Sequence, residues 1–158
     1  MAERALEYFK RSFFAVDGLW FVMLEEADSF DKALEIDERV WRAMPKIQSK
    51  KIRELYGIWG NGLRDLLRAL EAKFGMEGYR ASFEAEGDRA LILIHECPWF
   101  EIMKRAGRGA LAGRIGERIC KAEYRAWADE FDEGIGFSLD SQLCKGDDAC
   151  RLRFQYEE

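Results

Sequence analysis

Residues 89–98 read Arg-Ala-Leu-Ile-Leu-Ile-His-Glu-Cys-Pro, and they mark the point where the hydrophobic period of the sequence changes. The apolar run from Ala90 to Ile94 is typical of a strand that is buried on both faces. Cys97-Pro98 ends this strand, and Pro98 suits the first position of a helix because no N–H donor is needed there. The stretch therefore predicts a central strand that passes directly into a helix.

Further strands are predicted on both sides of this one. Residues 79–85 alternate apolar and polar side chains, and the turn Glu86-Gly87-Asp88 connects them to the central strand. Two strands near the C-terminus, at residues 136–143 and 150–156, flank a second turn. We therefore expect a four-stranded antiparallel sheet that is covered by helices.

Helices are predicted in the rest of the chain. One follows Pro98 as far as Gly107, and another passes through Trp127 after a glycine-rich joint at residues 107–116. The N-terminal part carries apolar side chains at helical spacing throughout. The predicted fold class is α+β, in which N-terminal helices pack with the sheet and with these two further helices. The chain forms a single domain, residues 1–158, with a helical half (1–75) and a mixed half (76–158).

Four positions are expected to divide the helical half. Asp17-Gly18 interrupts the first apolar pattern, and Ser29 can cap the next helix. Pro45 should kink or break that helix, because proline removes a donor and clashes with the preceding turn. Gly75 is expected to stop the last helix, which begins near Gly62.

Composition and charge exclude several classes of protein. With 48% hydrophobic and 35% charged residues the chain reads as globular, and its net charge of -5 argues against a nucleic-acid partner. The apolar stretches are too short to span a bilayer, and the N-terminus lacks a signal-peptide pattern. We therefore expect a cytoplasmic protein without a membrane partner. The apolar helices would allow a homodimer.

The reactive side chains are concentrated in the mixed half. Every cysteine, and the only histidine, lies between His95 and Cys150. The turn between Cys144 and Cys150 can bring both sulfurs near each other, and Cys97 lies at a helix start, which favours a thiolate. Four thiolates form a complete ligand set for zinc or for an iron–sulfur cluster. We expect one metal site; inert core cysteines, disulfides and a redox pair are the alternatives.

The stretch Ser-Leu-Asp-Ser-Gln-Leu-Cys-Lys-Gly-Asp-Asp-Ala-Cys-Arg-Leu-Arg-Phe, residues 138–154, resembles the end of 4-vinyl-reductase (V4R) domains. The resemblance implies that zinc is bound by Cys144, Cys150 and Cys120, and that a small apolar or aromatic molecule occupies a pocket. Some members supply a glutamate ligand just before the first hairpin cysteine, where this chain has Ser141 or Gln142. The fourth ligand is then expected to be Cys97, with His95 in reserve.

A nearer resemblance covers most of the chain. Cys97-Pro98-Trp99, the block Asp-Gly-Leu-Trp-Phe at residues 17–21 and Val40-Trp41 are similar to a largely uncharacterised group related to L-2-amino-thiazoline-4-carboxylic acid hydrolases. This resemblance implies the same fold and the same cysteine cluster. Asp17 with Trp20, Trp41 and Trp59 can line a ligand pocket, although aromatic residues at helical spacing are more often core.

Three functions remain open at this stage. The first is a binding module with a structural zinc and a small hydrophobic or aromatic ligand. The second is a hydrolase of a small cyclic C–N or C–S substrate, with His95 or Glu123 as general base and Cys97 as a candidate nucleophile. The third is an iron–sulfur protein with a redox or sensing role. Glu123 lies one helical turn after Cys120, where a solvated carboxylate is the commoner outcome.

Overall fold

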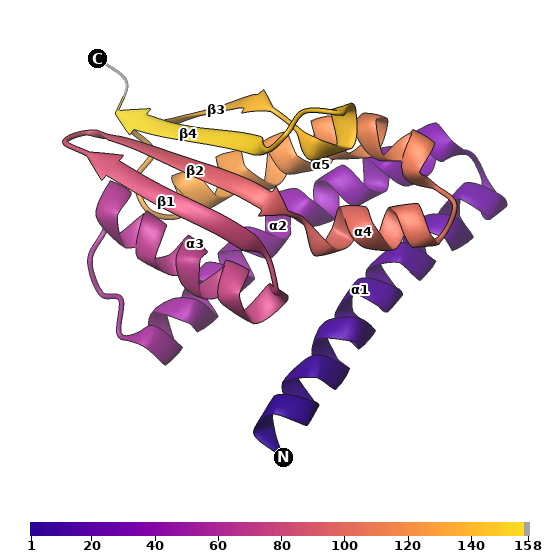
Figure 1. The fold of residues 1–158 in the computed structure, drawn as a ribbon, viewed down its shortest axis with the longest axis horizontal. Coiled ribbons are helices and arrows are strands. Elements are labelled where there is room, and N and C mark those ends of the chain that lie inside the picture. Colours follow the sequence, from indigo (N-terminus) through magenta and orange to yellow (C-terminus); the bar gives the residue numbers. More distant parts are fainter. Residues whose placement is uncertain (157–158) are drawn as a thin grey trace.

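The computed structural model describes residues 1–156 and confirms the α+β fold class: helices cover a four-stranded antiparallel sheet (Figure 1). In chain order the elements are α1 (Ala2–Ala27), α2 (Phe30–Tyr56), α3 (Leu63–Glu77), β1 (Arg80–Glu86), β2 (Arg89–Glu96), α4 (Pro98–Arg105), α5 (Gly109–Asp129), β3 (Ile135–Ser141), a short 3-10 turn (Leu143–Lys145) and β4 (Cys150–Tyr156). No helix of the part that the structure describes is long and apolar enough to cross a membrane.

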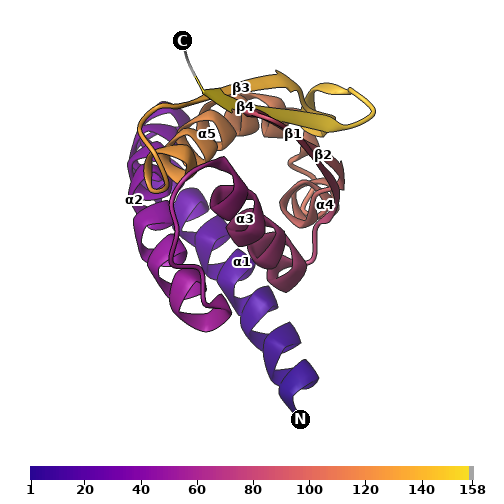
Figure 2. The same cartoon turned by 90° about the vertical axis from the view of Figure 1, so that its left-hand side faces the viewer.

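The sheet has the order β1-β2-β4-β3, with every neighbouring pair antiparallel. All the helices lie on one side of it, with α3 and α5 nearest and α2 farther away (Figure 2). Ile92 faces Leu152 across the central pair, and both are fully buried under α3 and α5. Leu91 and Leu93 are only half-buried, on the opposite face. The prediction that this strand is buried on both faces is therefore wrong, because helices cover one face only.

The helices are longer and less interrupted than the sequence predicts. α1 continues through Asp17-Gly18, since Phe14 and Phe21 on either side of the interruption are both buried against the rest of the protein. Pro45 lies inside α2 and does not end it. Ser29 caps α2 as predicted, because its Oγ accepts a hydrogen bond of 3.2 Å from the Lys32 amide.

Two glycines differ from the predicted breaks. Gly75 lies within α3, which ends instead at Gly78, where a φ of 85° gives the left-handed conformation that only glycine adopts without strain. The glycine-rich joint is also shorter than predicted, because α5 begins at Gly109. Gly113 and Gly116 are therefore helical, and a Cβ at Gly116 would lie 2.7 Å from the Cys144 sulfur. Position 116 therefore requires glycine because the Cys144 sulfur packs closely against it, and not because the chain turns there.

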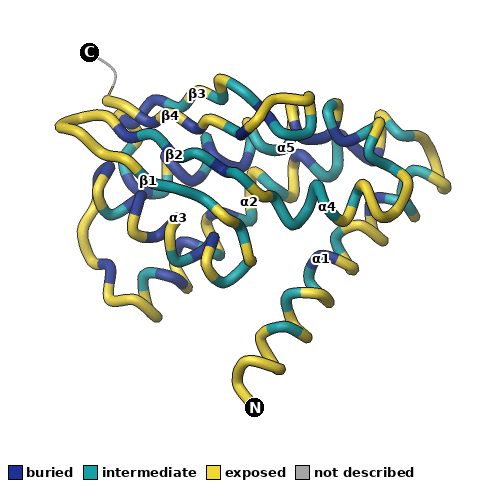
Figure 3. The backbone as a smooth tube through the Cα atoms, in the orientation of Figure 1, coloured by how far each residue is buried: buried dark blue, intermediate teal, exposed yellow. Residues whose placement is uncertain are grey.

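The interior consists of two clusters of buried side chains. The larger one lies between the sheet, α3 and α5, and includes Leu66, Trp127 and Phe154, each fully buried. The smaller one joins α1, α2 and α5 around Phe21 and Ile119. Much of α1 is exposed (Figure 3). The exposed large apolar side chains on the face of α1 that points away from both clusters are Tyr8, Phe9, Val16, Leu19, Trp20 and Met23. A homodimer through such a face stays a prediction.

We expect Leu66→Ala to lower the free energy of unfolding by about 2–5 kcal/mol, because Leu66 is fully buried and a cavity would remain. Leu55→Ala is the matched control, since Leu55 is 66% exposed on α2; its effect should stay below about 0.5 kcal/mol. Urea unfolding followed by circular dichroism measures both. Equal losses in the two variants would contradict the position of the core.

Candidate functional site

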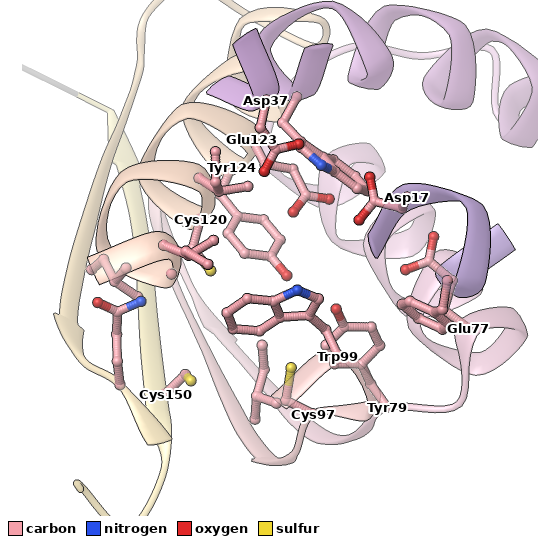
Figure 4. Close-up of a pocket in the computed structure, with 18 residues that line it drawn as sticks. Asp17, Asp37, Glu77, Tyr79, Cys97, Trp99, Cys120, Glu123, Tyr124 and Cys150 are labelled. Carbon is pink, nitrogen blue, oxygen red and sulfur yellow. The ribbon is translucent and has the colours of Figure 1, made fainter. Parts of the chain in front are cut away.

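A cavity with a volume of about 60 Å³ for the centres of water-sized molecules lies between the two core clusters. Its walls come from all five helices, the strands β2, β3 and β4, and the loops that join them. Apolar and aromatic side chains form most of the lining, and polar side chains gather in two places (Figure 4). One group consists of carboxylates. The other consists of cysteines.

The carboxylates of Asp17, Asp37, Glu77 and Glu123 form the first group, which we call the acidic end. They come from α1, α2, α3 and α5 and point toward a shared space in Figure 4. Lys73 is the basic residue beside them, and only 1% of it is exposed. Its ammonium lies 2.7 Å from a Glu77 oxygen and 3.0 Å from Oε1 of Glu123. The acidic end therefore contains more carboxylates than cations.

Burial changes the protonation of this group. It raises the pKa of Asp17 to about 6, while the Trp41 indole N–H acts in the opposite direction. Burial also raises the pKa of Asp37 to about 7, and the charge of Asp17 adds to that rise. For Lys73, burial lowers the pKa, but Glu123 and Glu77 outweigh it and raise the pKa overall, so Lys73 stays charged. Among residues 1–156, Asp17 and Asp37 have no such countercharge in an ion pair.

The middle of the pocket is aromatic. Trp99 lies between the two polar groups in Figure 4, beside Tyr79 and Tyr124. Burial is the main reason that the pKa of both tyrosines lies well above the usual value, so both remain neutral donors. A ligand in this part of the pocket would contact ring faces and phenol groups.

The second polar group contains Cys97, Cys120 and Cys150. Cys97 lies at the start of α4 as predicted, and the amides of Phe100 and Trp99 favour its thiolate. Burial is stronger, however, and raises the pKa of Cys97 to about 11, so the predicted thiolate is replaced by a neutral thiol. Burial likewise raises the pKa of Cys150 to about 12, although the Leu143 amide donates a 3.3 Å hydrogen bond to its sulfur.

Cys144 lies at the same end of the domain, where its sulfur faces Gly116 of α5. All four cysteines are free thiols, and none is fully exposed. As positioned, no three of the His, Cys, Asp and Glu side chains within residues 1–156 lie close enough to hold one metal ion. The fold thus brings the four predicted ligands to one region but does not arrange them around a common centre.

His95 does not share a face with Cys97. Its Nε2 lies 3.2 Å from Ser82 Oγ on the outer face of the sheet, and it does not line the pocket. The reason is that the chain leaves the strand at Cys97, which turns toward α4. Glu123, the other candidate base, does line the pocket and is 6% exposed, so the solvated carboxylate is not what the structure contains.

The sequence analysis missed several residues of the site: Lys73 lies beside Glu77 and Glu123, and the others line the pocket, namely Asp37, Glu77, Tyr79, Trp99, Tyr124 and Gln142. A signal exists for two of them: Lys73 follows Leu70 by three residues and Asp37 follows Ala33 by four, so both are charged residues on apolar helix faces. Trp41 lines the pocket as suggested, whereas Trp20 and Trp59 are 66% and 79% exposed.

Fold and pocket together define the class of protein: an α+β domain in which helices cover one face of an antiparallel sheet and enclose a largely apolar pocket. The chain belongs to a family of unknown function, DUF6125, whose model matches residues 3–151. Among curated proteins, no sequence gives a match.

A similar solved structure is that of trafficking protein particle complex subunit 3 from Naegleria fowleri, which is covalently bound to palmitic acid. The TM-score is 0.64 over 96% of this chain and 97% of that chain, with 14% sequence identity. The similarity is one of fold.

We expect Asp37→Asn to raise the melting temperature at about pH 8, to raise it less at about pH 5, and to change it little below about pH 4. The folded protein binds the Asp37 proton more tightly than the unfolded chain does, so the aspartate costs stability as the pH rises from about 4 to about 7. Each kcal/mol gained should correspond to about 2–4 °C. Asp88→Asn in the exposed β1–β2 turn is the control. A gain in melting temperature that is independent of pH would contradict the raised pKa of Asp37.

Proposed function

We propose that the chain is a small-molecule-binding domain whose pocket holds an apolar or aromatic ligand. The observation that carries this proposal is the pocket itself, which draws its walls from both halves of the chain and is lined mainly by apolar and aromatic side chains. Such concave, largely preformed sites are where proteins bind small molecules. The similar fold that carries palmitic acid adds support.

A buried polar group gives separate support. Gln142 lines the pocket and is 3% exposed, yet its side-chain amide nitrogen has no hydrogen-bond partner among residues 1–156. A buried donor without a partner costs about 1–3 kcal/mol. A ligand that offers an acceptor near Gln142 would remove that penalty.

We propose in addition that one structural zinc ion is bound by the thiols of Cys97, Cys120, Cys144 and Cys150. The proposal is supported by the gathering of the cysteines at one end of the domain, and by the resemblance of residues 138–154 to V4R domains. It requires the four side chains to draw closer than they lie in the structure. Zinc binding would also require the thiols to ionise, which the ion itself favours.

Filling the pocket tests the binding function. We expect 1-octanol to bind the protein at about one molecule per chain, and Ile119→Phe to weaken that binding by at least about tenfold, because Ile119 lines the pocket and is 8% exposed. Ile47→Phe is the matched control on a side chain that is 65% exposed. Isothermal titration measures the affinity, and circular dichroism verifies folding. Undiminished binding by a folded Ile119→Phe protein would refute the assignment to this pocket.

Elemental analysis and an absorption spectrum of protein purified without oxygen test the zinc site. We expect a colourless protein with about one zinc per chain, and Cys150→Ser should lose the metal and melt at a lower temperature. The control is Ser138→Ala on the neighbouring strand, where the side chain donates a hydrogen bond to Asp140. If the protein contains iron and sulfide, the site holds an iron–sulfur cluster and not zinc. Metal-free protein that is stably folded would overturn both.

A further inference from the structure

We propose that the acidic end of the pocket binds the cationic group of the ligand, an organic ammonium ion attached to an apolar or aromatic body. This inference rests on the proposed function, because the apolar body must occupy the middle of the pocket. It goes further by assigning the charge of the ligand, and therefore its chemical class.

The balance of charges carries the first step. Within residues 1–156 no ion pair includes Asp17 or Asp37, and their shared partner is the neutral Trp41 indole. Lys73 is already engaged by two other carboxylates, Glu77 and Glu123. Like charges close together in a poorly hydrated site repel each other. A cation that enters between them would remove this repulsion, whereas an anion would increase it.

A buried carboxylate that can accept a further donor carries the second step. Glu123 is 6% exposed and faces the pocket, and its Oε1 lies 3.0 Å from the Lys73 ammonium. Among residues 1–156 this oxygen has no partner with hydrogen-bond geometry, because the Lys73 ammonium donates its hydrogen bond to Glu77. A carboxylate oxygen has more than one acceptor site, so an N–H donor of a ligand would add a bond between charged partners, which are the strong ones.

The aromatic side chains next to the carboxylates favour the same class. Trp41 lies beside Asp17 and Asp37, and Tyr79 and Trp99 line the adjoining middle of the pocket. Ring faces attract cations, most strongly where water is excluded. Aromatic rings combined with carboxylates are a general means of recognising organic ammonium groups. The apolar remainder of the ligand would contact Ile119 and Phe14, which line the same pocket.

Two other occupants fit the geometry less well. The carboxylates do not gather closely enough to hold a metal ion among the described residues, whereas a protonated amine bonds at longer distances and in several directions. A fatty acid would bring a carboxylate toward an excess of carboxylates. The acid found in the solved structure of similar fold is therefore not the chemistry that the acidic end of this chain selects.

Three small-molecule probes with the same number of carbon atoms but different head groups test the inference: octylamine, 1-octanol and octanoate. We expect octylamine to bind at least about tenfold more tightly than 1-octanol at about pH 7.5, and octanoate to bind most weakly. Isothermal titration gives the affinities. Equal binding of the amine and the alcohol, or tighter binding of octanoate, would overturn the inference.

Charge-removing variants locate the effect. Asp17→Asn and Asp37→Asn should each reduce the preference for octylamine over 1-octanol several-fold. Asp88→Asn, which removes a charge from the exposed β1–β2 turn, should keep the full preference. A preference that survives in both pocket variants would place the cation elsewhere and overturn the inference.

The probes also separate the two proposals. If 1-octanol binds and octylamine has no advantage, the inference fails and the proposed function stands. If neither octylamine, 1-octanol nor octanoate binds to the folded protein, the proposed function fails and the inference fails with it. The amine preference in wild-type protein, together with its reduction in Asp17→Asn and Asp37→Asn, supports both.

Discussion

The buried ammonium of Lys73 is the interaction on which the arrangement of the helices depends. Lys73 is 1% exposed, and its ammonium joins Glu77 of the same helix to Glu123 of α5. A charge so far from water is tolerated only when it is paired, and removing one partner of such a pair typically costs about 3–5 kcal/mol. The contact therefore fixes α3 against α5 at the point where both helices border the pocket.

The same desolvation acts at both ends of the pocket. It keeps the thiols of Cys97, Cys120 and Cys150 protonated, and it raises the pKa of Asp17 and Asp37. Lys73 holds its charge because carboxylates oppose the effect of burial. An incoming cation would favour ionised partners at either end: an ammonium at the carboxylates, a metal ion at the thiols. Each polar group of the pocket would therefore be ionised most readily when a cation binds beside it, and an aromatic section separates the two groups.

Much of the fold could be predicted from the sequence, because its signals are local. The strands of both hairpins, the Ser29 cap and the passage from β2 through Cys97 into α4 follow from alternation, capping chemistry and the proline after Cys97. The predicted breaks at Asp17-Gly18 and Gly75 fail for a common reason. Packing on both sides of a glycine outweighs its low helix propensity of about 1 kcal/mol.

The sequence by itself determined the α+β class, the four-stranded antiparallel sheet and the residues able to bind a metal, since these depend on period, turn chemistry and residue type. Only the tertiary structure decided which of those residues meet. It separates His95 from Cys97 by directing one to the outer face of the sheet, and it joins Asp17, Asp37, Glu77 and Glu123 from four helices. The physical reason is that burial and electrostatic pairing arise between elements distant in sequence, where local periodicity contains no information about neighbours.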